Sequence, residues 1–406
     1  MSDLTRRSDS VLAAGADQEP AAGHDPAPGQ EPADGRRTAP DPDTTPVPDA
    51  TTTTTGTTPD PNATTDPDAT TTTTGTTTDP DTTTPDRGRM PWPAAAAAAS
   101  RYALVVVWAL MALVCYILMP HRFGSTATIS SIFGSQQVLV FLAMSAMITL
   151  VVGEFDLSIA SVMGIAATLI PVLVTSHGWN VWAACLFALL VCLAAGAVNA
   201  FFVVIIGVPS FVVTLGMGTL LMGAAQAVSG STIVSVASPS LSGFALHEVL
   251  GMPVSFYYGI LLAALLAYLL GWTPLGRGMV FVGASPEVAR LAGIPVRRIR
   301  IGAYLAGALV AGLAGVMLVA TVGGFDSSSS ATYLLPALAA VFLGTAVVQP
   351  GMFNPVGTMI AIYFLTTGIF GLQLLGFSGW IQNVFYGAGL VVAVTLAKVV
   401  RDRTTE

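Results

Sequence analysis

The sequence TPLGRGMVFVGASPEVARLAGIPVRRIR, residues 273–300, is the one long polar interruption in a chain that is apolar from about Tyr102 onward. It contains five arginines and a single acidic residue. Ser-Pro-Glu at 285–287 is typical of a helix start, with a capping hydroxyl, a proline at the first helical position and an acid in the first turn. Gly293, followed closely by a proline, is typical of a helix end. We therefore expect a short, capped, basic helix that lies between two membrane segments and contacts a partner in the cytoplasm.

The composition on either side of this stretch is that of a membrane protein with an acidic extension. Of 406 residues, 53% are hydrophobic and 10% are charged, and the mean hydropathy is +0.71, values typical of membrane proteins. Residues 1–86 contain four arginines and 16 acidic residues, a net charge of −12, whereas residues 87–406 contain 12 basic and seven acidic residues, a net charge of +5. The overall charge of −7 therefore averages two unlike regions.

Residues 1–95 form the acidic extension, rich in Thr, Pro and Asp. The sequence PDATTTTTGTTPDP at 48–61 recurs almost unchanged at 67–80. Such a segment buries too little apolar surface to offset its chain entropy, so we expect a disordered tail at 1–95 and a transmembrane domain at 96–406. The tail is either a tether or regulatory segment, or an upstream extension of a chain whose translation begins at Met90.

The remainder predicts an all-α integral membrane protein. Apolar segments of about 20 residues follow one another closely, each near the length that a membrane span requires. Our ten candidates are 102–120, 137–152, 157–175, 181–206, 209–229, 254–272, 301–322, 333–348, 356–375 and 380–398. With ten spans, 11 of the 12 basic residues after position 86 lie on one side, and only Arg122 lies opposite. The positive-inside rule then places both termini in the cytoplasm.

A polar break between the second and third candidate spans carries two carboxylates, Glu154 and Asp156, followed by Ser158. Ionisable groups at such a position are costly unless they face protein, water or a cavity, and interrupted helices expose backbone to substrate in many transporters. These residues are candidates for a substrate or ion pathway. The alternative is structural, with Asp156 and Ser158 capping the helix that follows.

Two further polar residues lie inside apolar segments. Asn199 is expected to bond a neighbouring helix, and Thr214 can bond back to its own backbone. We include both in the candidate pathway, with packing as the alternative. The three pairs of small residues spaced four apart in the segment 301–322 indicate close helix packing rather than substrate contact.

The sequence also argues against enzymatic function. Lys398 is the sole lysine and no G-x-x-x-x-G-K-[ST] motif is present, so the chain has no phosphate-loop lysine. The four histidines suggest no metal site, and no Ser/His/Asp arrangement can be identified. We therefore expect a non-enzymatic transport subunit without cofactor or metal, and with no nucleic-acid partner.

Four segments together resemble the ribose/xylose-type permeases of bacterial ATP-binding-cassette (ABC) sugar importers. They are GEFDLSIASVMG at 153–164, GVPSFVVTLGMGTL at 207–220, the basic stretch 273–301, and AAVFLGTAVVQPGMFNPVGTMIA at 339–361. The resemblance covers about 137–398 in the same order. It implies a multi-pass permease of the bacterial cell membrane, embedded in lipid, that forms a homodimer, rests on a cytoplasmic ATP-binding subunit and receives a monosaccharide from an extracytoplasmic sugar-binding protein.

The resemblance also assigns a role to the capped helix, which corresponds to the coupling helix that docks into a groove of the ATPase. The residues that carry the family pattern here are Ser285, Glu287, Ala289, Arg290 and Gly293. Two alternatives stay open. One is a proton- or ion-coupled secondary transporter that uses Glu154 and Asp156, and the other is a membrane scaffold whose acidic tail recruits proteins.

Overall fold

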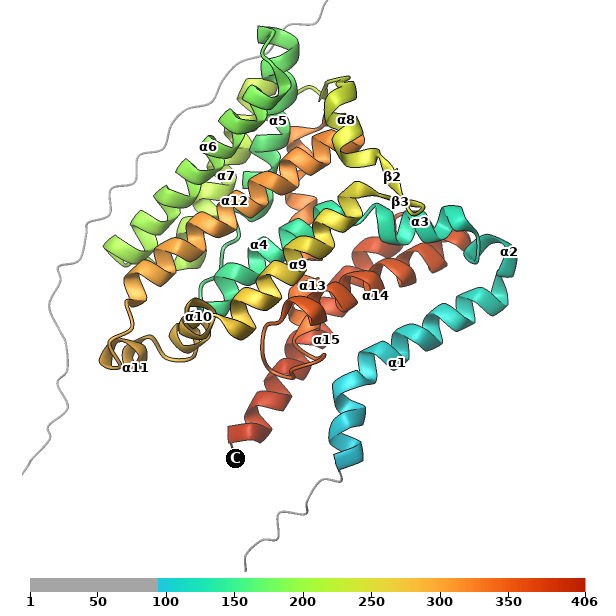
Figure 1. Ribbon diagram of the computed structural model, residues 1–406, viewed down its shortest axis with the longest axis vertical. Helices are drawn as coiled ribbons and strands as arrows, with labels where there is room; N and C mark the ends of the chain where they lie inside the picture. Colours follow the sequence, from blue (N-terminus) through green and yellow to red (C-terminus); the bar gives the residue numbers. More distant parts are fainter. Residues whose placement is uncertain (1–93, 406) are drawn as a thin grey trace, which may run out of the picture. The chain divides into compact units, whose positions relative to one another are not determined.

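The computed structural model describes residues 94–405, so the predicted acidic tail lies outside the described residues up to position 93. The described chain is almost entirely helical, as predicted (Figure 1). Its helices are α1 (Ala94–Leu118), α2 (Pro120–Phe123), α3 (Thr126–Gly134), α4 (Gln137–Val151), α5 (Ile159–His177), α6 (Val181–Ala200) with the π-helical turn η1 (Phe201–Ile206), α7 (Ser210–Ser229), α8 (Pro239–Leu246), α9 (Val254–Trp272), α10 (Pro274–Ala284), α11 (Pro286–Leu291), α12 (Val296–Val322), the 3-10 helix η2 (Ser327–Tyr333), α13 (Leu334–Gly344), α14 (Pro355–Leu374) and α15 (Trp380–Thr405).

Four strands of two residues each lie in the loops between these helices. β1 (Val234–Ser235) pairs antiparallel with β4 (Gly324–Phe325), and β2 (Glu248–Val249) pairs antiparallel with β3 (Met252–Pro253). The pairing of β1 with β4 connects the loop that precedes α8 to the end of α12.

The predicted count of ten spans is wrong for the described residues, in which eight helices are long and apolar enough to cross a membrane. The apolar part of α1, Tyr102–Leu118, is shorter than these eight helices. The second half of α15 contains Lys398, Arg401, Asp402 and Arg403, which interrupt its apolar run. The second predicted segment is longer than expected, because α3 extends it to Thr126–Val151.

Helix α12 is the centre of the bundle, and α4, α5 and α6 pack directly along it (Figure 1). Small residues allow this approach, as the spacing in the sequence predicted. A Cβ on Gly307 would meet Thr149 of α4 at 3.3 Å, one on Gly312 would meet Cys192 of α6 at 3.0 Å, and one on Gly315 would meet Ala166 of α5 at 2.7 Å. Any larger side chain at Gly315 would push α5 and α12 apart.

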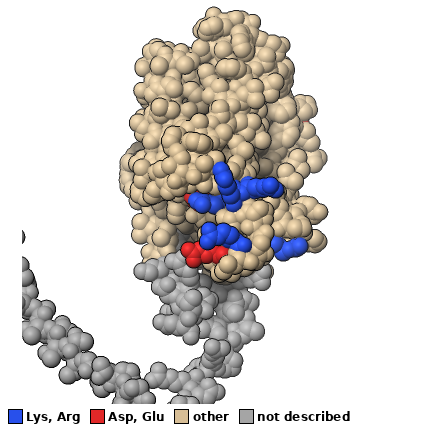
Figure 2. Space-filling view, turned by 90° about the vertical axis from the view of Figure 1, so that its left-hand side faces the viewer, with Lys and Arg blue, Asp and Glu red and all other residues tan. Residues whose placement is uncertain are grey.

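The charged residues mark one end of the bundle. Arg277, Arg290, Arg297, Arg298 and Arg300 lie in or beside α10, α11 and the start of α12, and we call this the basic end. Figure 2 shows Lys and Arg side chains confined to the lower part of the face it displays, with uncharged residues above them. The start of α1 and the end of α15 lie on the same side, whereas α2, which contains Arg122, lies opposite with α3 and α8 at what we call the distal end (Figure 1). This arrangement agrees with the predicted cytoplasmic placement of both termini.

Candidate functional site

The polar break predicted between α4 and α5 is present as a non-helical segment, residues 152–158, at the basic end. Both of its carboxylates are buried, with Glu154 only 7% and Asp156 only 4% exposed, whereas Phe155 between them is exposed. Their burial in protein confirms that these charges avoid lipid. The two acidic side chains therefore both point into the bundle, where each has its own partners.

Glu154 faces the central helix α12. Its carboxylate forms an ion pair with the Arg300 guanidinium, and its Oε2 accepts a hydrogen bond of 3.3 Å from the Tyr304 hydroxyl. Tyr304 is completely buried. Arg300 and Tyr304 are one helical turn apart, so both reach the same carboxylate. The ion pair therefore ties the break to the first turns of α12, directly after the basic loop.

Asp156 bonds within its own segment and organises the start of α5. Its Oδ1 accepts hydrogen bonds from the Ser158 amide at 2.9 Å and from the Ser158 hydroxyl at 2.6 Å. Burial raises the pKa of Asp156, and the two hydrogen bonds from Ser158 lower it in part. Asp156 does not cap α5 directly, because the N-cap position is Ser158, whose hydroxyl is turned back to the carboxylate. The expected capping by Ser158 is therefore absent, since Asp156 competes for that hydroxyl.

Asn199 and Thr214 complete the network, as the sequence suggested. The Asn199 amide donates to the Ser158 hydroxyl at 2.9 Å, and its own Oδ1 is buried without a hydrogen-bond partner in the described part of the chain. The Thr214 hydroxyl accepts from the Leu157 amide at 3.1 Å and lies 2.9 Å from the Ser210 carbonyl, to which it can donate. Helices α6 and α7 thus bond the break through Asn199 and Thr214.

All five residues predicted for the pathway therefore lie in one buried region, at the basic end of the bundle. Sequence reasoning missed Arg300 and Tyr304, which neutralise and bind Glu154 from α12. Arg300 had been counted only as a flanking charge, and Tyr304 is an isolated aromatic residue in an apolar span. No local pattern could have paired either of them with Glu154.

The basic loop forms two helices rather than one. Thr273 caps α10, accepting a hydrogen bond from the Gly276 amide at 3.1 Å, and this helix was not predicted. The predicted helix is α11, whose N-cap Ser285 accepts from the Val288 amide at 3.4 Å. At its end Gly293 adopts a φ of 77°. The Gly293 and Ile294 amides donate to the carbonyls of Arg290 and Ala289, each at 3.0 Å, which is the Schellman pattern.

Helix α11 has one buried residue that packs against the protein and several exposed ones. Ala289 is fully buried, whereas Glu287 and Arg290 are exposed. The charged side of α11 is therefore exposed at the surface of the described part of the chain.

Glycines connect the basic loop to the polar break. Gly283, near the end of α10, lies so close to the Val151 carbonyl and the Gly153 backbone that a Cβ there would overlap α4. Gly153 itself has a φ of 82°, a conformation that favours glycine. The end of α10 therefore packs in backbone contact with the segment that carries Glu154 and Asp156.

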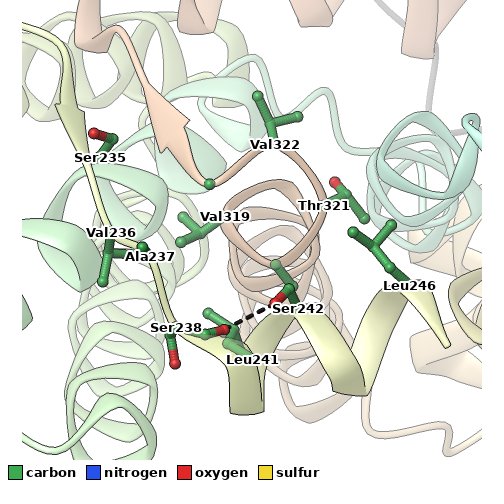
Figure 3. A pocket seen from close by; sticks show the side chains of 12 residues that line it. Ser235, Val236, Ala237, Ser238, Leu241, Ser242, Leu246, Val319, Thr321 and Val322 are labelled. Atoms are coloured by element: carbon green, nitrogen blue, oxygen red, sulfur yellow. Dashed lines mark hydrogen bonds between the residues drawn. The ribbon is translucent and has the colours of Figure 1, made fainter. Parts of the chain in front are cut away.

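Two cavities lie at the distal end, on either side of the end of α12. The first, of about 380 Å³, lies between the last turn of α12 and the segment 235–246 (Figure 3). Figure 3 shows Ser238 and Ser242 on its α8 side, joined by a hydrogen bond of 3.0 Å from the Ser242 hydroxyl to the Ser238 carbonyl. The second, of about 680 Å³, shares Leu246, Thr321 and Val322 with the first. No group of three or more His, Cys, Asp or Glu that could hold a metal ion occurs among the residues that the structure describes.

Comparisons with known proteins agree with this architecture. The chain is similar to the autoinducer 2 import system permease protein LsrC of Salmonella typhimurium, 28% identical over 288 residues, or 70% of this chain and 82% of that protein. The LsrC protein of Escherichia coli (strain K12 / DH10B) is 28% identical over 294 residues, 71% of this chain and 85% of that protein. No solved structure matches the chain. Residues 128–394, which include the polar break, the basic loop and the central helix α12, match the family described as the branched-chain amino acid transport system / permease component, and the chain belongs to this family of multi-pass membrane permeases.

Proposed function

We propose that the chain is the membrane-spanning subunit of an ABC importer, which moves a monosaccharide or a similar small polyol into the cell. The observation that carries this proposal is the family match over residues 128–394 together with relatives that are named import system permeases. In this proposal residues 96–406 are the permease domain and residues 1–95 are the tail. The relatives' named substrate, autoinducer 2, is one candidate cargo beside pentoses and hexoses of the ribose and xylose type.

In this function α11 is the coupling helix that docks on a separate cytoplasmic ATP-binding subunit. Its exposed Glu287 and Arg290 would contact the ATPase, while buried Ala289 anchors the helix to the permease. Ser285 and Gly293 fix its two ends through the cap and the left-handed turn. Closure of the ATPase pair then displaces α11 and α10, and the contact of Gly283 with Val151 passes this displacement to the break.

Glu154, Asp156, Ser158, Asn199 and Thr214 are, in the same proposal, the hinge of the inner gate. Their hydrogen bonds join the start of α5 to α6 and α7, and the Glu154–Arg300 ion pair joins it to α12. Alternating access requires two arrangements of such a region that nucleotide favours differently. A polar network at the junction of four helices can change partners without exposing charge to lipid.

The second copy of the permease would pack against α7. The outward face of this helix contains Gly216, Thr219 and Gly223, which are exposed, and nothing lies within 4 Å of a Cβ built on either glycine. Small residues on an exposed membrane helix allow close approach of another helix. Since Cys115, Cys185 and Cys192 are buried, a Gly223→Cys variant should form a disulfide-linked dimer in native membranes, and an equally exposed Leu261→Cys on α9 should not.

Reconstitution tests the proposal. The full chain, a candidate ATP-binding subunit and a sugar-binding protein are placed in liposomes, and uptake of labelled D-ribose, D-xylose and autoinducer 2 is measured. ATP-dependent uptake of at least one of them is expected, together with stimulated ATP hydrolysis. Uptake that persists without the ATPase and collapses with an uncoupler would instead support the secondary transporter, in which Glu154 and Asp156 would form the proton or ion site. In either case deletion of residues 1–89 should leave uptake unchanged, and its loss would favour the scaffold.

A further inference from the structure

The larger distal cavity, of about 680 Å³, is lined by both polar and apolar side chains, and no step above uses it. It lies where four elements meet: the junction of α3 and α4, the end of α12, the start of α13 with η2, and the first turns of α15. Its size is within the range of small-molecule sites. Being at the distal end, it lies on the side from which an importer receives its cargo.

The polar groups that line this cavity are amides and hydroxyls, without any charge. The carboxamides belong to Gln136 and Gln137 at the start of α4 and to Gln382 and Asn383 of α15. The hydroxyls belong to Ser135, Thr321, Thr332, Tyr333 and Tyr386. No Asp, Glu, Lys, Arg or His is among the lining residues. A charged ligand would need a compensating charge in such a site, so this lining selects a neutral one that both donates and accepts hydrogen bonds.

Gln137 contributes a buried acceptor that has no hydrogen-bond partner among the described residues. The residue is 5% exposed, and the acceptor is its Oε1. A buried acceptor that is left unpaired costs free energy, so such groups normally have a partner. Gln137 begins α4 and lines the cavity. A turn of its carboxamide toward the cavity would let a ligand hydroxyl donate to this oxygen.

Tyr386 provides the second anchor from the facing side. It is 6% exposed, so its ring is packed into the bundle, and its hydroxyl makes no hydrogen bond to another described residue. A tyrosine in this setting offers an apolar ring face and one polar tip. Sugars present the same combination, with C–H faces and a rim of hydroxyls.

We propose that this cavity binds a neutral polyhydroxylated molecule of monosaccharide size, with Gln137 accepting from one hydroxyl and Tyr386 bonding another. The proposal rests on the function proposed above, and it adds a binding site within a single permease chain, at the distal end. The substrate class follows from the lining: neutral sugars and polyols enter, and sugar acids and amino sugars are rejected.

Binding to the full chain in nanodiscs tests the site directly. The discs are made from phosphatidylcholine alone, which contains no glycolipid headgroup, and saturable binding of labelled D-ribose, D-xylose and D-galactose is measured. At least one should bind. Gln137→Leu keeps the side-chain volume but removes the amide, and it should weaken binding about tenfold, the equivalent of one lost hydrogen bond to a buried group. Tyr386→Phe removes a single oxygen and should weaken binding several-fold.

The matched control is Gln373→Leu, which makes the same change in α14, at a partly buried glutamine that lines none of the described cavities. This variant should bind like the unaltered chain. D-galacturonate should bind at least about tenfold more weakly than D-galactose, because its carboxylate would be buried without a counter-charge. Thermal unfolding of each variant in the same discs shows that it is folded.

Three results would overturn the proposal: no saturable binding of any of the sugars, equal binding by Gln137→Leu and Gln373→Leu, or binding sites occupied only when a glycolipid is added to the discs. Failure of the site and failure of the function are distinguishable. ATP-driven uptake that is identical in the Gln137→Leu and Gln373→Leu complexes would leave the function standing without the site. If sugar binding depends on Gln137 but no ATPase supports uptake, the binding site is supported and the proposed function is not.

Discussion

Arg300 on the first turns of α12 forms an ion pair with Glu154 in the break between α4 and α5, and Tyr304 binds the same carboxylate from one turn further on. The pair connects the helix that leaves the coupling loop with the segment that begins α5. It therefore connects the start of α12 with the polar network of the bundle.

Removing one partner of this pair should destabilise the protein. Glu154→Gln leaves the Arg300 guanidinium partly buried without its counter-charge. Since the arginine side chain is 25% exposed, solvent screens part of this cost, and we expect a loss of about 1–3 kcal/mol in unfolding free energy. Thermal or denaturant unfolding in detergent measures it.

A double-mutant cycle provides the control for this prediction. In the variant Glu154→Gln/Arg300→Gln neither charge remains, so the combined loss should be smaller than the sum of the two single losses. Additive losses would mean that the two side chains do not interact.

Charge reversal on the coupling helix should disrupt the contact with the ATPase and leave the fold intact. Glu287 and Arg290 are exposed and have no ion-pair partner among the described residues. We expect Glu287→Lys or Arg290→Glu to lower permease-stimulated ATP hydrolysis about tenfold, because the reversed charge would face a like charge across the interface. Arg122→Glu, an exposed arginine at the distal end, should have no effect. If both α11 variants stimulate ATP hydrolysis as strongly as the unaltered chain, α11 is not the coupling helix.

The left-handed turn that ends α11 should depend on glycine. Gly293 has a φ of 77°, so Gly293→Ala should cost about 1–2 kcal/mol in local stability. Hydrogen exchange of the α11 amides should accelerate, and coupling should fall with it. Gly302→Ala in α12 is the control, because nothing lies within 4 Å of its added Cβ and its backbone is helical. Equal exchange in the two variants would contradict the prediction.

The buried carboxyl of Asp156 should make stability depend on pH. Its pKa in the folded chain is raised by burial above the ordinary value of 3.8, which the unfolded chain retains. The folded state therefore holds the proton more tightly, and stability falls as the pH rises from 3.8 through the folded-state pKa. Asp156→Asn keeps an oxygen that accepts from Ser158 but does not titrate.

Melting temperatures of the two chains between acid and neutral pH check this prediction. The unaltered chain should lose more stability over that window than Asp156→Asn. Parallel curves would mean that Asp156 is not a source of the pH dependence, and a steeper loss in the variant would reverse the inferred sign.

Local features of this protein could be read from the sequence because they depend on neighbouring residues alone. The helix start at Ser285, the left-handed end at Gly293 and the polar break around Asp156 all follow from short-range capping, backbone conformation and hydropathy. The close packing of α12 followed from the spacing of its small residues. The span count did not, because hydropathy in the sequence selected ten segments, whereas eight helices among the described residues are long and apolar enough to cross a membrane.

The tertiary structure decided which distant residues meet. Glu154 and Asp156 are two positions apart, yet one pairs with Arg300 on α12 and the other organises Ser158 and Asn199 toward α6. Gln137 and Tyr386 line one cavity although α4 and α15 are at opposite ends of the chain. Such pairs arise from the packing of whole helices, in which small residues set how closely backbones approach. The sequence by itself determined the break, the capped helix and the membrane setting, and only the packing around α12 determined what those groups touch.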